Sequence, residues 1–118
     1  MVGDLHYLSL VEVARRLEAR QLTSVQATQT ILDRIEQIDP KLKCYATLTA
    51  DRALADAAAR DAETAAGASR GPLHGVPIAV KDLCNTAGVP TAAGMAIHRN
   101  RVPSEDATVV ARLKARVR

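Results

Sequence analysis

Aromatic side chains are almost absent from this 118-residue chain, which has two Tyr, no Phe and no Trp. Aromatic residues usually supply much of the area that a core buries. Any core here must therefore be built from Leu, Val, Ile and Ala. Hydrophobic residues still make up 47% of the chain and charged residues 25%. This composition is globular and excludes the low-hydrophobicity signature of a disordered chain.

Cysteine is scarce, and long apolar runs are missing. Cys44 and Cys84 form neither a CxxC pair nor the framework of a small secreted domain. No stretch approaches the roughly 18 apolar residues that span a bilayer. The first residues show no basic region followed by an apolar run, so no signal peptide is indicated. These features favour reduced thiols in a cytoplasmic protein without a membrane partner.

The usual signatures of metal and cofactor sites are also missing. His6, His74 and His98 have no acidic or cysteine partner at ligand spacing, and a surface or loop position is expected for each. There is no Walker loop and no GxGxxG motif. We therefore expect no metal and no cofactor. The net charge is +3, but the basic residues are mostly dispersed, which favours a solvated surface over a nucleic-acid interface.

Apolar periodicity predicts three helices in the first half of the chain. Ser9 and Glu12 fit a capping box before a helix over roughly Leu10–Ala19. Thr23 or Ser24 caps a second amphipathic helix, which Pro40 is expected to end. The third helix is expected to follow a Thr49 cap, to cover Ala50–Ala66 and to stop at Gly67.

The second half differs in composition, because four of the six glycines and four of the five prolines lie between residues 71 and 103. Such a segment reads as ordered, functional loop. Two short strands are expected, one over Cys44–Leu48 and a buried one over Ile78–Val80. A last helix is expected to begin near Ser104–Asp106, where negative charge suits a helix N-terminus. Its apolar face would carry Val109, Val110, Leu113 and Val117.

Lys81 is the one residue whose surroundings suggest chemistry. It follows the apolar run Ile78–Val80 inside the Gly/Pro-rich segment. Loss of water around an amine disfavours its charged form, and a neutral amine beside a hydroxyl can act as a general base. The alternative is a strand-end lysine that reaches solvent or pairs with Asp82. Cys84 could serve as a nucleophile only with a histidine partner, which nothing in the sequence places beside it.

Three motifs in this order resemble the amidase signature family. They are Gly71–Asp82 (GPLHGVPIAVKD), Gly88–Gly94 (GVPTAAG) and Glu105–Val110 (EDATVV). The resemblance covers nearly the whole chain. It implies an α/β fold, a mixed sheet covered by helices, of which this chain would hold the leading helices and two or three short strands.

The resemblance also implies a mechanism and a substrate class. A lysine takes a proton from a serine on a cis peptide bond, and that serine relays to a nucleophilic serine that attacks a carboxamide. An acyl-serine forms, ammonia or an amine leaves, and water releases the acid. The lysine role is carried over to Lys81. The loop around Thr91–Met95 is expected to line the substrate pocket through Thr91, Gly94 and Met95.

Both family serines lie downstream of the motifs present here. Residues 1–118 are therefore expected to be the N-terminal part of a single amidase domain, truncated before the catalytic serines and inactive alone. Its partners would be a small-molecule amide and the remaining portion of its own domain. Where the family continues with an Ala-Gly-Ala-like turn, this sequence reads Leu113–Arg118 (LKARVR).

Two other readings stay open. One is a fragment of the glutamine-dependent subunit that amidates mischarged tRNA, in which case nucleic acid would be a partner. Leu83–Gly88 (LCNTAG) looks more like general amidases. The other is a non-catalytic helical interaction module, which would fold alone and for which Lys81 would be dispensable.

Overall fold

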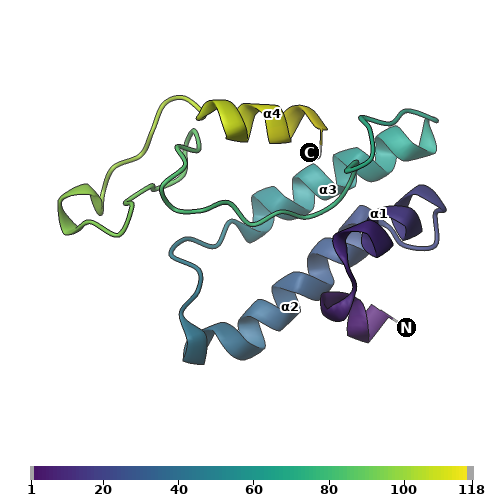
Figure 1. The fold of residues 1–118 in the computed structure, drawn as a ribbon, viewed down its shortest axis with the longest axis horizontal. Helices are drawn as coiled ribbons and strands as arrows, with labels where there is room; N and C mark the ends of the chain where they lie inside the picture. The colour runs from purple at the N-terminus through teal and green to yellow at the C-terminus, as the bar shows by residue number, and fades with distance from the viewer. Residues whose placement is uncertain (1, 117–118) are drawn as a thin grey trace. The chain divides into compact units, whose positions relative to one another are not determined.

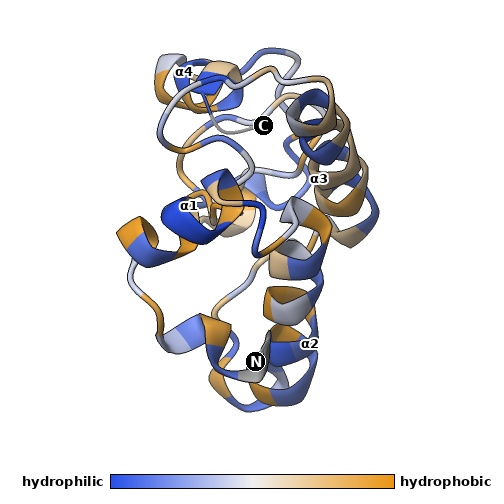
Figure 2. Ribbon diagram, turned by 90° about the vertical axis from the view of Figure 1, so that its right-hand side faces the viewer, coloured by the Kyte–Doolittle hydropathy of each residue, from blue (hydrophilic) through white to orange (hydrophobic). Residues whose placement is uncertain are grey.

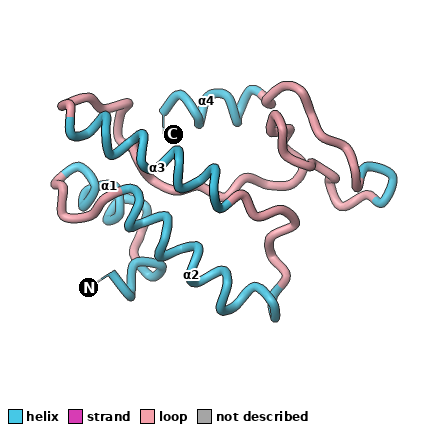
Figure 3. Tube along the Cα trace, turned by 180° about the vertical axis from the view of Figure 1, so that it is seen from behind, coloured by secondary structure: helices cyan, strands magenta, loops and turns pink. Residues whose placement is uncertain are grey.

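The computed structural model describes residues 2–116, and within that range the chain folds into helices and loops (Figures 1 and 3). The chain divides into two compact units, one running to Pro77 and the other covering Ile78–Ala115. The first unit holds the 3-10 helix η1 (Val2–Tyr7) and the α-helices α1 (Leu10–Glu18), α2 (Ser24–Leu42) and α3 (Ala50–Ala65). The second holds η2 (Ala96–His98) and most of α4 (Thr108–Arg116).

In the first unit, α2 packs against both α3 and η1. The core consists of aliphatic side chains, as the lack of aromatics requires; they are Leu5, Val13, Leu17, Leu22, Ala27, Ala57 and Val76. Figure 2 shows apolar and polar residues alternating along the helices, which is the pattern of amphipathic helices with one buried face. In the second unit, Val110 is the large side chain that is fully buried, at 2% exposure.

The predicted helix starts and ends are largely confirmed. The capping box predicted at Ser9 and Glu12 is half formed: the Ser9 side chain accepts from the Glu12 backbone N–H at 3.2 Å, but the Glu12 carboxylate pairs with Arg16 instead. Thr23 and Gln26 form a complete capping box at the start of α2. Thr49 occupies the cap position of α3, although its side chain makes no capping hydrogen bond. Gly67 has a φ of +79° directly after α3, as expected of a terminating glycine.

The prediction that Pro40 ends the second helix is wrong, because α2 continues to Leu42. Asp39 secures this last turn from both its carbonyl and its side chain. The carbonyl accepts the Lys43 N–H at 2.7 Å, and Oδ1 accepts the Cys44 N–H at 2.6 Å. Lys43 then ends the helix with a left-handed backbone at φ 51°.

The two predicted strands are also wrong for the described residues, and the strand part of the expected fold is not present there (Figure 3). Cys44–Leu48 is exposed throughout, and Ile78 and Val80 are 39% and 38% exposed. Within residues 2–116, the backbone of residues 78–80 makes no hydrogen bond. A strand exists only through pairing with a neighbour, so β-branched residues alone do not form one.

The last helix begins at Thr108, two to four residues after the predicted start near Ser104–Asp106. The Asp106 side chain turns to other partners, while the Ala107 carbonyl accepts the Ala111 N–H at 2.9 Å. On the predicted apolar face, Val110 is buried and Val109 is half exposed. Val117, the last member of that face, lies outside the described residues.

Candidate active site around Lys81

Lys81 follows the extended segment 78–80 and opens a turn. Its carbonyl accepts the Cys84 N–H at 2.9 Å, which fixes the backbone of the lysine. Its side chain is exposed and makes no hydrogen bond or ion pair with any described residue. Of the alternatives for Lys81, the described residues show the one in which the side chain reaches solvent. Within residues 2–116 it neither pairs with Asp82 nor loses its contact with water, so the expected desolvation of the amine is not found there.

Asp82 ends the lysine segment, Gly71–Asp82, and joins it to the loop predicted to line the substrate pocket. Its carboxylate Oδ1 accepts the Ala92 N–H at 3.2 Å, and its carbonyl accepts the Ala93 N–H at 3.1 Å. The loop closes on itself through a bond from the Met95 N–H to the Ala92 carbonyl at 3.0 Å. Lys81 and the 91–95 loop are thus neighbours through Asp82.

The three predicted substrate residues differ in their surroundings. Thr91 is buried at 3% exposure, and its hydroxyl donates to the Val89 carbonyl at 3.1 Å. Gly94 is exposed and has a φ of +71°, while Met95 is 47% exposed. Thr91 therefore anchors the loop, and Gly94 and Met95 are the members of the set that a ligand could touch.

Arg101 braces the other side of this loop. Its carbonyl accepts the Thr91 N–H at 2.9 Å, and its guanidinium donates to the Thr91 carbonyl at 3.3 Å. The same guanidinium donates to Asn85 Oδ1 at 2.9 Å. Asn85 in turn accepts the Ala107 N–H through its carbonyl at 2.8 Å. Hydrogen bonds rather than a large core thus hold the second unit together.

The Asp106 carboxylate also holds a loop, through a hydrogen bond and an ion pair close to α4. Its Oδ1 accepts the Ala87 N–H at 2.8 Å, and its Oδ2 pairs with the Lys114 ammonium. The carboxylates of Asp82 and Asp106 therefore each hold a backbone N–H of a loop in the same unit. They act on different loops, and Asp82 is the one beside the lysine.

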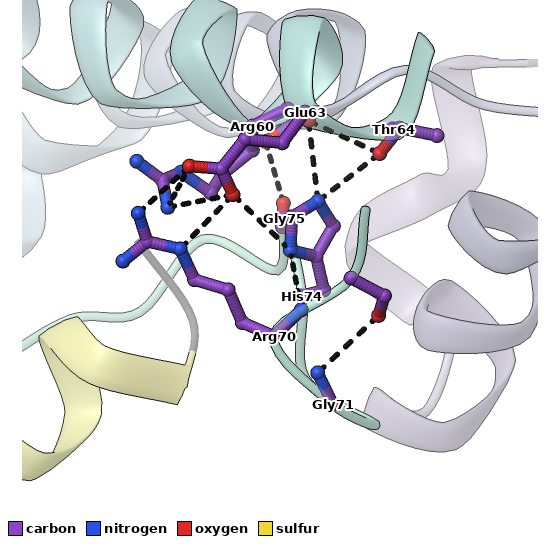
Figure 4. A network of polar contacts seen from close by, with 9 residues as sticks. Arg60, Glu63, Thr64, Arg70, Gly71, His74 and Gly75 are labelled. Carbon is purple, nitrogen blue, oxygen red and sulfur yellow. Dashed lines mark hydrogen bonds and ion pairs between the residues drawn. The ribbon is translucent and has the colours of Figure 1, made fainter. Parts of the chain in front are cut away.

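The beginning of the glycine-rich lysine segment belongs to the first unit, where His74 fastens it to α3 (Figure 4). Its Nδ1 accepts the Arg70 N–H at 3.2 Å, so the ring proton sits on Nε2. Nε2 lies 3.1 Å from the Arg60 carbonyl and 3.0 Å from the Thr64 hydroxyl. His74 thus fills a structural role in a loop, at 10% side-chain exposure.

A salt-bridge cluster surrounds this histidine. Glu63 lies 2.7 Å from Arg70 and 2.9 Å from Arg60, with His74 Nδ1 at 3.9 Å (Figure 4). The hydrogen bond from Arg70 lowers the pKa of Glu63, assisted by the charge of Arg60, while partial burial opposes the shift. The same bond raises the pKa of Arg70. The charged forms of both partners are therefore favoured.

The start of α2 is the second anchor for the lysine segment. The Ser24 hydroxyl donates to the Gly75 carbonyl at 2.6 Å. Asp61 of α3 accepts the Ser24 N–H at 2.7 Å and the Val25 N–H at 3.0 Å. These bonds satisfy helix donors that would otherwise be free. Residues from α2, α3 and the glycine-rich segment therefore meet at one point.

Sequence reasoning did not find these anchoring residues. The partners are 37 residues apart for Ser24 and Asp61 and 51 apart for Ser24 and Gly75, so no local pattern connects them.

For metals, no group of three His, Cys, Asp or Glu residues gathers within residues 2–116. Over the same residues, no helix combines the length and apolarity that a membrane crossing needs.

The helices and the anchored lysine segment are those of an amidase. The Amidase family model matches residues 26–116, and the chain belongs to this family. AmiD of Mycobacterium tuberculosis, named as an amidase, is 56% identical over 108 residues, which are 92% of this chain and 23% of that protein. A glutamyl-tRNA(Gln) amidotransferase subunit of Moorella thermoacetica is 44% identical over 94% of this chain and 23% of its own.

Solved structures agree with the sequence comparison. The peptide amidase of Stenotrophomonas maltophilia gives a TM-score of 0.84 at 38% identity, over 92% of this chain and 23% of that one. A protein of a complex linked to an s-triazine catabolic enzyme gives 0.86 at 33% identity, over 92% and 24%. The amidase fold predicted from the three motifs is confirmed for the matched part. The chain spans about a quarter of the length of these relatives.

Proposed function

We propose that the protein hydrolyses a carboxamide C–N bond through an acyl-serine intermediate, with Lys81 as the base that starts proton transfer. The observation that carries this proposal is the family match over residues 26–116, within which the lysine segment is intact. Among residues 2–116 the Lys81 side chain is exposed, so the base role is supported by the family match and not by burial of the amine within this chain.

In this proposal Lys81 accepts a proton from the hydroxyl of one serine, which takes the proton of a second, nucleophilic serine. The nucleophile attacks the carbonyl carbon of the amide, and the amine leaves with a proton. Water then attacks the acyl-serine and releases the acid. Both serines belong to the part of the family domain downstream of the motifs described here, so residues 1–118 supply the base alone.

The 91–95 loop is the proposed substrate contact of this chain. Gly94 and Met95 are exposed in a turn that Asp82 ties to the lysine segment. Thr91, at the start of the same loop, is buried, and its backbone is bound by Arg101. A small amide is the substrate class that this arrangement serves. For its compartment we propose the cytoplasm, supported by two free cysteines.

The decisive experiment compares the complete gene product with its Lys81→Ala variant on a panel of small carboxamides, following ammonia release. Loss of the general base should lower kcat by a factor of about 10²–10⁴. Lys41→Ala, which removes an exposed lysine of α2, is the matched control and should leave kcat unchanged. Equal kcat for the wild type and the Lys81→Ala variant would refute the proposal.

A second candidate is the role of the amidotransferase relatives, favoured by the protein from Moorella thermoacetica with its 44% identity. AmiD at 56% identity favours the standalone amidase. The two functions differ in the fate of the ammonia that leaves the amide: the standalone amidase releases it, whereas the amidotransferase passes it on to mischarged tRNA. Glutamine-dependent amidation of glutamyl-tRNA by the complete product, together with partner proteins, would establish the second function.

A further inference from the structure

We propose that Asp82 is a positioning residue that fixes the 91–95 loop beside Lys81 and so determines how tightly the loop holds the substrate. The inference rests on the amidase function proposed above.

Asp82 presents two acceptors to two successive amides of the loop. Oδ1 accepts the Ala92 N–H at 3.2 Å, and the carbonyl accepts the Ala93 N–H at 3.1 Å. Two bonds to neighbouring peptide groups fix the orientation of that stretch of backbone, which one bond would leave free to rotate. Because Asp82 directly follows Lys81, the loop is tied to the residue next to the proposed base.

The backbone of the loop needs such support. Ala93 has a φ of 52° and Gly94 a φ of 71°, so both central residues of the Ala92–Met95 turn are left-handed. Glycine adopts this geometry readily, whereas a residue with a Cβ populates it sparsely. Ala93 therefore stays in this conformation only where its surroundings hold it, and its own N–H is one of the two that Asp82 receives.

The other fastening of the loop acts on a different residue. Arg101 holds Thr91 through its carbonyl and its guanidinium. Thr91 is buried, whereas the residues that face solvent, Gly94 and Met95, lie on the far side of the amides that Asp82 binds. Arg101 thus fixes the start of the loop at Thr91, and Asp82 fixes the backbone conformation of the exposed turn.

The test uses the complete gene product and its Asp82→Ala, Asp82→Asn and Asp106→Ala variants. Asp82→Ala should raise KM for a small carboxamide about tenfold, the factor that corresponds to one lost hydrogen bond, with kcat changed far less. Asp82→Asn keeps an oxygen at Oδ1 for the Ala92 N–H and should restore KM close to the wild-type value. Asp106→Ala removes a comparable carboxylate bond, to Ala87, and should leave KM unchanged.

Amide hydrogen exchange gives a readout that does not depend on activity. The Ala92 amide, which binds the Asp82 carboxylate, should exchange faster in Asp82→Ala than in the wild type, and at the wild-type rate in Asp106→Ala. The Ala93 amide binds the main-chain carbonyl of Asp82, which every variant keeps. Unchanged exchange at Ala92, an unchanged KM in Asp82→Ala, or equal rises in KM for Asp82→Ala and Asp106→Ala would each overturn the positioning role. Failure of the amidase function would show differently, as a wild-type protein without turnover or a fully active Lys81→Ala variant.

Discussion

At the scale of single residues, Gly75 combines a left-handed backbone with a crowded Cβ position. Its φ is +79°, and a Cβ built there would lie 3.3 Å from the Ser24 Cβ and 3.4 Å from its Oγ. Gly67 has the same φ of +79°, but nothing lies within 4 Å of its Cβ position. The two glycines therefore separate the effect of backbone conformation from the effect of close packing.

Gly67→Ala should destabilise the protein by about 1 kcal/mol, the cost of a left-handed residue with a Cβ. Gly75→Ala should cost about 1–3 kcal/mol more, because Ser24 must move and its bond to the Gly75 carbonyl is disturbed. Urea unfolding followed by circular dichroism measures both. Equal losses in the two variants would show that the contact with Ser24 contributes nothing.

Glu63 gives the protein a stability that depends on pH. Its pKa is lowered from 4.5 in the folded protein, chiefly by the hydrogen bond from Arg70, so the folded state binds fewer protons than the unfolded state near that pH. The stabilisation is therefore fully present above pH 4.5 and is lost as the pH falls through the lower folded value.

The unfolding temperature of the wild type should fall more steeply below pH 4.5 than that of Glu63→Gln. The glutamine variant should be the less stable of the two at neutral pH, and the difference should shrink as the pH falls. Glu36→Gln, which alters an exposed glutamate of α2, corrects for the loss of one carboxylate. Parallel curves for wild type and Glu63→Gln would contradict the assignment.

At the scale of elements, the first turn of α2 is completed by a residue from another helix. Thr23 caps the Gln26 N–H at 3.0 Å, and Asp61 of α3 receives the N–H groups of Ser24 and Val25. A carboxylate at this end also meets the positive end of the helix dipole. The contact between α2 and α3 is therefore polar at this end as well as apolar along its length.

Asp61→Ala should destabilise the protein by about 1–2 kcal/mol, as the loss of a helix cap does. Asp61→Asn keeps an acceptor but removes the charge, so its loss should be smaller. Thermal unfolding of the two variants measures the difference. A change in Asp61→Ala of less than a few tenths of a kcal/mol would show that water replaces the carboxylate at no cost.

The sequence predicts these elements unequally, and the reason is the range of the interactions. Helix starts at Thr23 and Thr49 and the stop at Gly67 depend on residues a few positions away, so they were predictable. The strand predictions at 44–48 and 78–80 failed because pairing depends on a partner strand. The extent of α2 past Pro40 was missed because the Asp39 bonds that support it lie in the following turn.

The candidate site shows the same division. Lys81 and the 91–95 loop could be proposed from motifs in one stretch of chain. The bonds that place them could not, because Asp82 meets Ala92 across ten residues and Arg101 meets Asn85 across sixteen. The residue types in a motif indicate which side chains could react or bind. Their hydrogen-bond partners in the folded chain determine where those side chains lie.

At the scale of the whole molecule, many large apolar side chains lie open. Ile97 is 85% exposed, Leu42 63%, Leu83 61% and Val102 54%. The chain covers about a quarter of its relatives' length. These exposed side chains are available for binding an apolar probe.

We expect the isolated 118-residue polypeptide to release no ammonia from carboxamides, because the proposed triad acts as a unit. It should also enhance the fluorescence of an apolar dye such as ANS, since its exposed side chains bind it. Amide turnover by this polypeptide that Lys81→Ala abolishes would contradict the first expectation. A sharp two-state thermal transition without dye binding would favour the helical interaction module.

The bond between Ser24 and Gly75 has a consequence for synthesis on the ribosome. It closes a span of 51 residues, and a contact of such long range forms only after the intervening chain has emerged. Helix α2 is translated early, but its first N–H groups wait for Asp61, and the Ser24 hydroxyl waits for Gly75. Lys81 follows Gly75 by six residues, so the acceptor of the anchoring bond emerges shortly before the proposed base.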